Sequence, residues 1–319
     1  MSEKPIRISA AQFEHKSLDK DYNLSVIDSM SEEASTGGAS VIAFHECCIT
    51  GYTVARTLSR NELLDIAESV EGGESVKRLA DISKKHGITI LAGLFERDEE
   101  KVYNTYVCVD ENGLIASHRK LHPFIHPMLS AGNDYTVFTL HGWTCGILIC
   151  YDNNIPENVR ATHLLGADVL FMPHVTMCTP STRPGAGFVD PGLWQDRDKN
   201  AELLRSEFDG LKGRKWLMKW LPSRAYDNAS YVVFTNPIGM DHDQLKNGCS
   251  MIMDPFGDIL AECRNLGDDL VTADLTPDKL KQAGGYRYAN ARRPELYGEV
   301  ISSPHTPRQN VAWLEKKQP

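Results

Sequence analysis

The chain has 319 residues, of which 41% are hydrophobic, so it can bury the core of one large domain or two ordinary ones. Its formal net charge of −9 argues against nucleic acid or an anionic membrane surface as a partner. No apolar run approaches the length of a membrane span, and the first residues lack signal-peptide features, so we expect a cytoplasmic protein. The eight cysteines are irregularly spaced, which favours reduced thiols over disulfides.

Strands and helices alternate through the first half of the chain. Apolar residues at Leu24, Ile27 and Met30 share one helical face, and Asn112-Gly113 is typical of a hairpin turn. The predicted strands lie at residues 6–13, 40–44, 88–95, 102–110, 114–118, 136–140, 143–149 and 168–172. The predicted helices lie at residues 22–34, 74–86 and 157–165. This alternation, interrupted by hairpins, indicates a mixed sheet with helices on its faces.

The second half of the chain is less regular. Residues 174–212 are rich in proline, glycine and charge, and we predict a long loop that covers the active site or a subunit contact. A helix at 214–228, kinked at Pro222, precedes a strand at 231–235, a hairpin at 250–261 with its turn at Asp254-Pro255-Phe256-Gly257, and a strand at 270–274. We therefore expect one domain over residues 1–282 with an insertion at 174–212. A tail, 283–319, would pack on this domain or on a neighbouring subunit.

Three chemically active side chains stand at predicted strand ends, namely Glu46, Lys120 and Cys150. Cys150 lies between an apolar strand and a helix that Pro156 can begin. Backbone N–H groups at such a turn favour the thiolate and can hold an oxyanion. Each residue also has a plainer interpretation: Glu46 as a salt-bridged carboxylate, Lys120 as a solvated surface charge, and Cys150 as a small buried hydrophobe.

The flanking residues resemble the nitrilase superfamily of carbon–nitrogen hydrolases, whose catalytic residues are Glu, Lys and Cys in that order. Six segments carry the resemblance along most of the chain. They are Glu46 with Thr50-Gly51-Tyr52, Arg119-Lys120-Leu121-His122, Cys150-Tyr151-Asp152 with Pro156-Glu157, Arg224 to Asn228 with Asn236, Asp254-Pro255-Phe256-Gly257, and Arg292-Arg293-Pro294-Glu295-Leu296-Tyr297. His45 stands where the family usually has proline. The resemblance implies an α-β-β-α sandwich and a homodimer or larger even homo-oligomer.

The resemblance also implies a cysteine mechanism. Glu46 would take the proton of Cys150 and later deliver it to the leaving group, and Lys120 would stabilise the oxyanion. We expect oxyanion or substrate-binding positions at Tyr52, His126, Tyr151, Asn153, His174 and Val175. Neither a cofactor nor a metal is required, and the histidines near residue 120 match no zinc spacing.

One departure from the family pattern concerns a second glutamate, usual seven or eight residues after the lysine. Those positions are Pro127 and Met128 here, and no acidic residue lies between Lys120 and Gly132. His126 could take its place, or be an ordinary loop histidine. A glutamate from the insertion, such as Glu202 or Glu207, is the other candidate.

The sequence thus favours hydrolysis of a small linear amide or N-carbamoyl compound through a thioester, with release of ammonia. Cys150-Tyr151-Asp152 resembles amidase and carbamoylase members more than nitrilases, where tryptophan and glutamate commonly follow the cysteine. A nitrilase is the first alternative. A non-catalytic binding or assembly protein on the same fold is the second, because the second glutamate is missing.

Overall fold

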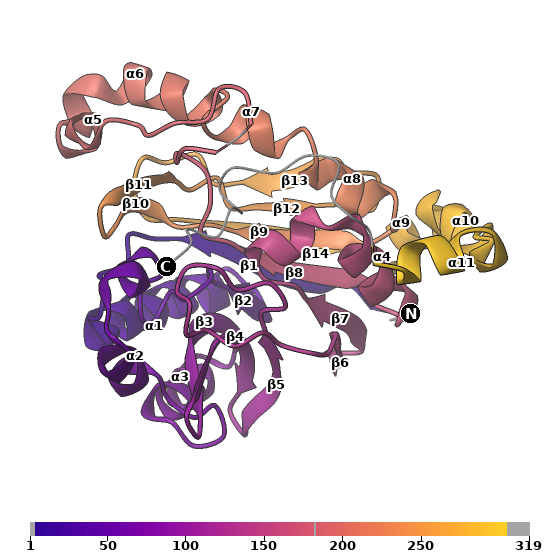
Figure 1. Ribbon diagram of the computed structural model, residues 1–319, viewed down its shortest axis with the longest axis horizontal. Helices are drawn as coiled ribbons and strands as arrows, with labels where there is room; N and C mark the ends of the chain where they lie inside the picture. The colour runs from indigo at the N-terminus through magenta and orange to yellow at the C-terminus, as the bar shows by residue number, and fades with distance from the viewer. Residues whose placement is uncertain (1–3, 182, 305–319) are drawn as a thin grey trace.

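Two six-stranded sheets form the centre of the molecule in the computed structural model, which describes residues 4–181 and 183–304 (Figure 1). The first sheet has the order β14-β1-β2-β3-β4-β5, from β1 (Ile6–Gln12), β2 (Val41–Ala43), β3 (Thr89–Asp98), β4 (Lys101–Asp110), β5 (Gly113–Arg119) and β14 (Asp269–Leu275). The second has the order β13-β12-β9-β8-β7-β6, from β6 (Thr136–Leu140), β7 (Trp143–Ile147), β8 (Val169–Pro173), β9 (Tyr231–Thr235), β12 (Met251–Met253) and β13 (Ile259–Glu262). Both sheets are mixed, because three central strands of each are parallel and the other neighbours antiparallel.

The two sheets pack face to face, and strand alternation explains how. In β8, Val169 and Phe171 join the apolar cluster that both sheets share, whereas Leu170 and Met172 join the cluster under the outer helices. A strand that is buried on both faces has a continuous run of apolar residues in its sequence, and Val169–Pro173 is such a run.

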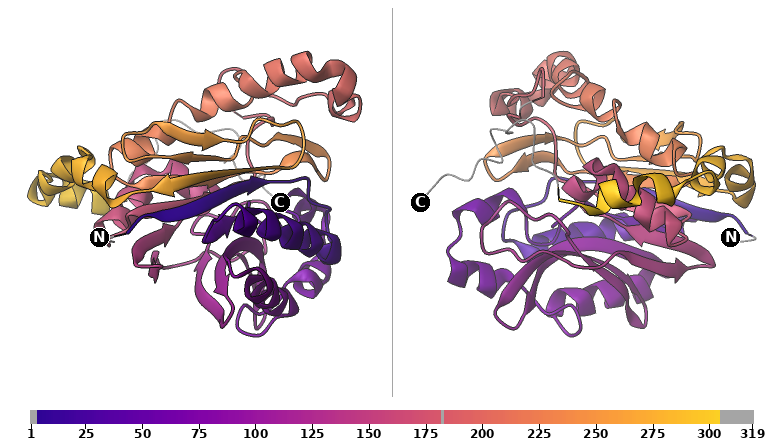
Figure 2. Two further views of the ribbon diagram at one scale, coloured as in Figure 1. Left: turned by 180° about the vertical axis from the view of Figure 1, so that it is seen from behind. Right: turned by 45° about the vertical axis from the view of Figure 1, so that its right-hand side comes forward.

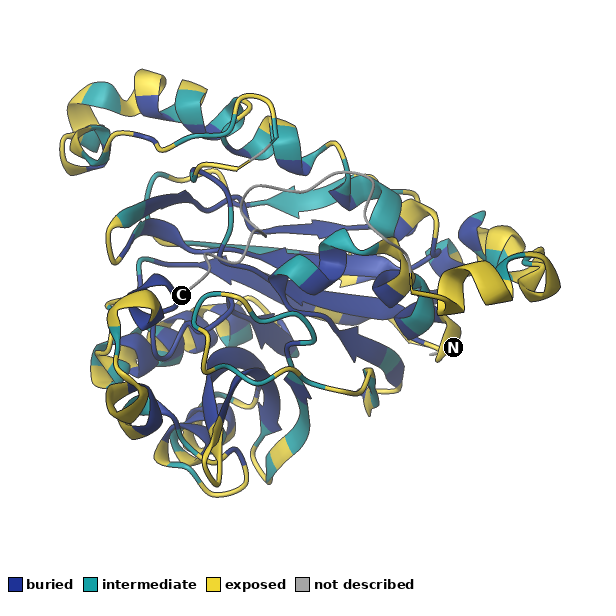
Figure 3. Cartoon of the chain, viewed as in Figure 1, coloured by how far each residue is buried: buried dark blue, intermediate teal, exposed yellow. Residues whose placement is uncertain are grey.

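Helices cover the outer face of each sheet, as the resemblance implied. α1 (Lys20–Thr36) and α3 (Glu74–His86) lie on the first sheet, where Leu24, Ile27 and Leu79 enter its outer core. α4 (Pro156–Leu164), α6 (Arg197–Asp209) and α8 (Leu221–Tyr226) lie on the second sheet, whose outer cluster includes residues from all three. Figure 3 shows the buried strands between more exposed helices. The predicted α-β-β-α sandwich is confirmed.

The structure corrects three expectations about the second half of the chain. Residues 174–212 are not one irregular loop, because α5 (Pro191–Gln195) and α6 occupy much of the stretch. The helix expected at 214–228 is two short helices, α7 (Arg214–Leu217) and α8, and the second begins just before Pro222. A hairpin of β10 (Ile238–Asp241) and β11 (Gln244–Asn247) was not predicted.

The tail is more regular than its sequence suggested. α9 (Pro277–Gln282), α10 (Gly285–Asn290) and α11 (Pro294–Ser302) lie at one end of the molecule, as Figure 2 shows from two sides. The Tyr286 hydroxyl donates to Asp168 at 3.0 Å and anchors α10, whereas α11 contributes no buried residue. Residues 305–319 of the expected tail lie outside the described residues. Among described residues, none of the helices has the length and apolar character needed to span a membrane.

Candidate active site

The topology brings Glu46, Lys120 and Cys150 together. They follow the ends of β2, β5 and β7, strands that belong to two different sheets. Glu46 Oε1 accepts a hydrogen bond from Lys120 Nζ at 2.6 Å, and both side chains are 0% exposed. Lys120 is therefore not a solvated surface charge, and that alternative is wrong. Burial disfavours its ammonium group, but the adjacent Glu46 charge outweighs this effect and raises the pKa of Lys120 well above its usual value.

Glu46 is held in one position by contacts from three segments. Its Oε1 also accepts from Asn104 Nδ2 at 2.6 Å, and its Oε2 accepts from the Val175 backbone N–H at 3.0 Å. Gly93 in β3 permits the close approach of this segment, since a Cβ there would lie 2.2 Å from the Cys47 nitrogen. The sequence analysis missed Asn104, although a buried amide within the apolar strand β4 is a signal for a polar partner.

Cys150 occupies a strained turn directly after β7. Its φ is 51°, in the left-handed region that non-glycine residues seldom adopt, and it begins the 3₁₀ turn η2 (Cys150–Asn154). Burial and the Glu46 charge raise the pKa of Cys150 to about 12, against the opposing effects of Lys120 and the Val175 N–H. The thiol is therefore protonated near neutral pH. A backbone N–H does favour the thiolate here, but it is that of Val175, and burial and the Glu46 charge outweigh it.

Asp152 ties the Cys150 turn to the segment that follows Lys120. Its carboxylate accepts from the backbone N–H of Leu121 at 3.1 Å and of His122 at 2.9 Å, and contacts His122 Nδ1 at 2.8 Å. Burial alone would raise the pKa of Asp152, but the neighbouring rings of His118, whose Nε2 lies 3.9 Å away, and of His122 hold it well below its usual range. The sequence motif contained Asp152, but this connecting role was not predicted from it.

Asn153 and His174 form a buried pair beside the same turn. Asn153 Nδ2 donates to the Leu148 carbonyl at 2.8 Å and lies 3.1 Å from His174 Nε2. Burial, with the Lys120 charge, lowers the pKa of His174 to about 3, so the imidazole is neutral at physiological pH. Arg224 of α8 donates to the Asn153 carbonyl at 2.8 Å and holds the turn from outside. These contacts indicate that Asn153 and His174 support the turn.

Two aromatic residues of the expected site lie around Lys120 and Cys150. The Tyr52 ring centroid is 5.2 Å from Lys120 Nζ, and its buried hydroxyl has no hydrogen-bond partner among the described residues. The Tyr151 ring packs edge-on against Phe124, whose own centroid is 5.0 Å from Lys120 Nζ. The expected site residue Val175 takes part through its backbone N–H, which donates to Glu46 Oε2. The Tyr52 hydroxyl is thus available to a bound molecule.

The described contacts of the candidates for the missing glutamate are made with residues other than Glu46, Lys120 and Cys150. His126 Nε2 contacts the Leu58 carbonyl at 3.2 Å, and its Nδ1 accepts from the Met128 N–H at 3.1 Å. Glu207 pairs with Lys212 at 2.5 Å within the insertion, and Glu202 is exposed on α6. The substitution of the missing glutamate by His126 or by a glutamate of the insertion stays a prediction.

The insertion begins at the site and then leaves it. His174 and Val175 lie within the cluster, but α5 and α6 continue to the far side of the second sheet, where α5 contacts β11 (Figure 1). Trp194 Nε1 of α5 donates to Glu14 Oε1 at 3.1 Å and fixes that end. The prediction that residues 174–212 cover the site or a subunit contact stays a prediction.

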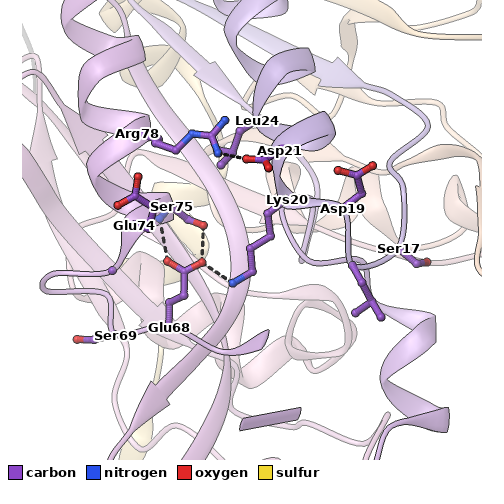
Figure 4. Close-up of a pocket in the computed structure, with 12 residues that line it drawn as sticks. Ser17, Asp19, Lys20, Asp21, Leu24, Glu68, Ser69, Glu74, Ser75 and Arg78 are labelled. Atoms are coloured by element: carbon purple, nitrogen blue, oxygen red, sulfur yellow. Dashed lines mark hydrogen bonds and ion pairs between the residues drawn. The ribbon is translucent and has the colours of Figure 1, made fainter. Parts of the chain in front are cut away.

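A surface cavity of about 740 Å³ lies elsewhere, and none of the three cluster residues lines it. It opens between α1 and α3, where Figure 4 shows Lys20 pairing with Glu68, and Arg78 with Asp21. These two ion pairs engage the cavity's lysine and arginine, and the three residues of the cluster lie outside it.

Comparisons with known proteins agree with this geometry. The family model for carbon–nitrogen hydrolases matches residues 7–284. The 2-oxoglutaramate amidase of Bacillus subtilis is 31% identical over 72% of this chain and 76% of its own. An (R)-stereoselective amidase of a Pseudomonas species is 28% identical over 95% of this chain and 97% of its own.

A solved amidase from Nesterenkonia, bound to acrylamide, has the same fold. It aligns with a TM-score of 0.69 and 22% identity, over 92% of this chain and 97% of that one. The family match over most of the chain, together with the buried cluster at the strand ends, shows that this protein belongs to the carbon–nitrogen hydrolase family.

Proposed function

We propose that the protein hydrolyses a small linear amide or N-carbamoyl compound through a thioester on Cys150, with release of ammonia. The observation that carries this proposal is the joining of Glu46, Lys120 and Cys150 in one buried cluster. A carboxylate at 2.6 Å from a lysine, with a thiol beside it, supplies a base, a positive charge and a nucleophile together.

Formation of the thioester requires a proton transfer because the thiol is protonated at rest. Glu46 accepts the thiol proton as the sulfur of Cys150 attacks the carbonyl carbon. The carbon–nitrogen bond then breaks, and Glu46 gives this proton to the departing nitrogen. Water attacks the resulting thioester, Glu46 takes a proton from it, and the proton returns to the sulfur as the carboxylic acid leaves.

Negative charge develops on the carbonyl oxygen in both halves of this cycle. Lys120 is the cation in position to stabilise it, with the backbone N–H of Tyr151 as the second donor that we assign. Such preorganised donors contribute about 3–4 kcal/mol each to transition-state stabilisation. The hydrogen bonds of Asn104 and Val175 to Glu46 keep the carboxylate beside the sulfur throughout, so little reorganisation is needed.

The names of the relatives support amide substrates without selecting one. Two are the amidases described above, and others are a citrullinase of Francisella tularensis and an N-carbamoylputrescine amidase of tomato. A relative from Pyrococcus abyssi is named a nitrilase. We place this chain with the amidases because Tyr151 and Asp152 follow its cysteine, and Asp152 makes the contacts that shape the turn.

The experiment is a screen of linear amides, N-carbamoyl amino acids and aliphatic nitriles for released ammonia. We expect amides or carbamoyl compounds to react and nitriles to be inert. Conversion of a nitrile to acid and ammonia, with no amide turned over faster, would replace the proposal by the nitrilase alternative. No ammonia from any compound would support the binding-protein alternative.

A further inference from the structure

A second buried lysine lies beside the cluster, and the proposed mechanism does not use it. Lys246 in β11 is 3% exposed, although it carries an ammonium group on a flexible stem. Charges that act on it come from Asp241, Cys178, Cys150 and Glu46, so it lies within electrostatic reach of the proposed nucleophile and base.

The ammonium group of Lys246 is poorly satisfied. It can donate three hydrogen bonds, and the partner that the described residues offer is Gln244 Oε1 at 2.9 Å. Among those residues, it forms no ion pair within 4.0 Å. Asp241 uses its oxygens elsewhere, on Thr53 and on His15 Nε2 at 2.9 Å. Burial without an ionic partner is costly, and it lowers the pKa of Lys246.

The hairpin register turns Lys246 toward the site. Asp241 pairs with Gln244, and Gly239 pairs with Lys246, so these four residues project from one face of the β10–β11 hairpin. Asp241 on this face accepts from the backbone N–H of Thr53 at 3.1 Å. Thr53 follows Tyr52, whose unpartnered hydroxyl and ring lie at Lys120. The face that carries Lys246 thus meets the segment that lines the cluster.

We propose that Lys246 binds a carboxylate of the substrate, so that the preferred substrates are amides that bear an acidic group at the end opposite the scissile bond. This inference rests on the proposed function and specifies its substrate class. A carboxylate would give the buried ammonium its missing ionic partner and additional hydrogen-bond acceptors.

The test compares substrates of similar shape and different charge. Succinamate carries a carboxylate, isocaproamide a neutral isopropyl group, and β-alaninamide an ammonium group. For the unmodified enzyme we expect kcat/KM to be greatest for succinamate and least for β-alaninamide. Lys246→Met should lower the ratio of kcat/KM for succinamate to that for isocaproamide by on the order of 100-fold, mainly through KM. Lys246→Arg should retain much of the ratio.

Lys279→Met is the matched control, because Lys279 pairs with Asp254 at 2.5 Å in α9 and does not face the cluster. It should leave the ratio within about twofold of the native value, within the range of ordinary surface changes. A ratio equally unaffected by Lys246→Met would overturn the inference while leaving amide hydrolysis intact.

A binding measurement makes the inference independent of turnover. Titration of succinate into Cys150→Ala should show binding, and adding Lys246→Met should weaken it on the order of 100-fold. If succinate does not bind, or binds equally well without Lys246, the inference is wrong whether or not amides are hydrolysed. If succinate binds through Lys246 but no amide releases ammonia, the carboxylate site stands and the proposed amide hydrolysis is wrong.

Discussion

Two lysines are buried in the part of the chain that the structure describes, and their surroundings have opposite consequences. Lys120 lies 2.6 Å from Glu46, and its pKa is raised well above the usual value by that charge, despite burial. Lys246 has the neutral Gln244 as its hydrogen-bond partner, and burial lowers its pKa despite the more distant charge of Asp241. Depth alone therefore does not decide the state of a buried cation, and a direct ionic partner does.

The difference suggests a division of work between the two groups. A lysine already paired in the resting protein is held rigidly and can serve a reaction that forms charge at a fixed point. A lysine without an ionic partner can form a new ion pair with an anionic group of a ligand.

Loss of Lys120 should lower activity on every substrate, whatever its charge. For Lys120→Ala we expect kcat to fall by on the order of 1,000-fold or more, since an oxyanion partner is removed. Glu46→Gln should be as severe, and the double variant should cost little more, because the residues act as a unit. Ammonia release measured with neutral and anionic amides checks this. Near-normal turnover by Lys120→Ala would reduce Lys120 to a structural charge.

Replacement of each buried lysine by methionine should change the free energy of unfolding in different directions. Lys120→Met leaves Glu46 buried without its cation and should lower the free energy of unfolding by about 3–5 kcal/mol. Lys246→Met removes a charge that has no direct ionic partner among the described residues and should be neutral or stabilising. Urea unfolding of both variants at pH 7 gives the comparison. Equal destabilisation would show that Lys246 has an ionic partner after all.

Alkaline pH should distinguish the two lysines again. In the unfolded chain each titrates near 10.5. The folded pKa of Lys246 is lower, so as pH rises from that value to 10.5 the unfolded state binds more protons, and stability from this group increases. Lys120, with its raised pKa, contributes stability that is fully present below 10.5 and is lost only as pH rises through its folded value.

The measurement for this prediction is the unfolding free energy of the native protein minus that of Lys246→Met, at pH 7 and pH 10. The subtraction cancels the cysteine thiols, which titrate in both proteins. We expect the difference to rise in favour of the native protein, by about 1.4 kcal/mol for each unit of depressed pKa that is crossed. A constant difference would mean that Lys246 stays protonated throughout.

The smallest effect should come from His126, which the sequence offered as a substitute for the missing glutamate. Its ring already contacts the Leu58 carbonyl and the Met128 N–H. His126→Ala should change kcat/KM by about threefold or less and leave the pH–rate profile intact. Disappearance of an ionisation near ~6.5 in that variant would return His126 to the site.

The sequence predicted the parts of this site that are local along the chain. Glu46, Lys120 and Cys150 each end an apolar strand, and the turn at Cys150 was expected from the strand before it and Pro156 after it. The strand predicted at 168–172 lies next to that strand as β8. The contacts of Asn104 and Asp152 were not predictable, because each joins segments distant in the sequence.

Lys246 was missed for a different reason. The β10–β11 hairpin is short, contains Gly239 and the Asp241-His242-Asp243 turn, and lacks an alternating pattern long enough to indicate strands. Its burial depends on α5 and on the Thr53 segment, which pack against it from remote positions. The charge state of Cys150 could not be predicted either, since it depends on burial that only the complete fold produces.

The most direct test of the account is ammonia release by Cys150→Ala beside Cys145→Ala. Cys145 lies on β7, the strand that leads to the Cys150 turn, and its thiol is also buried, so it controls for loss of a buried thiol. The account predicts that Cys145→Ala turns over a small amide at a rate near that of the native enzyme. Cys150→Ala should fold, by circular dichroism, and be slower by on the order of 10,000-fold or more. Turnover by Cys150→Ala within tenfold of the native rate would contradict the thioester mechanism and the role given to the cluster.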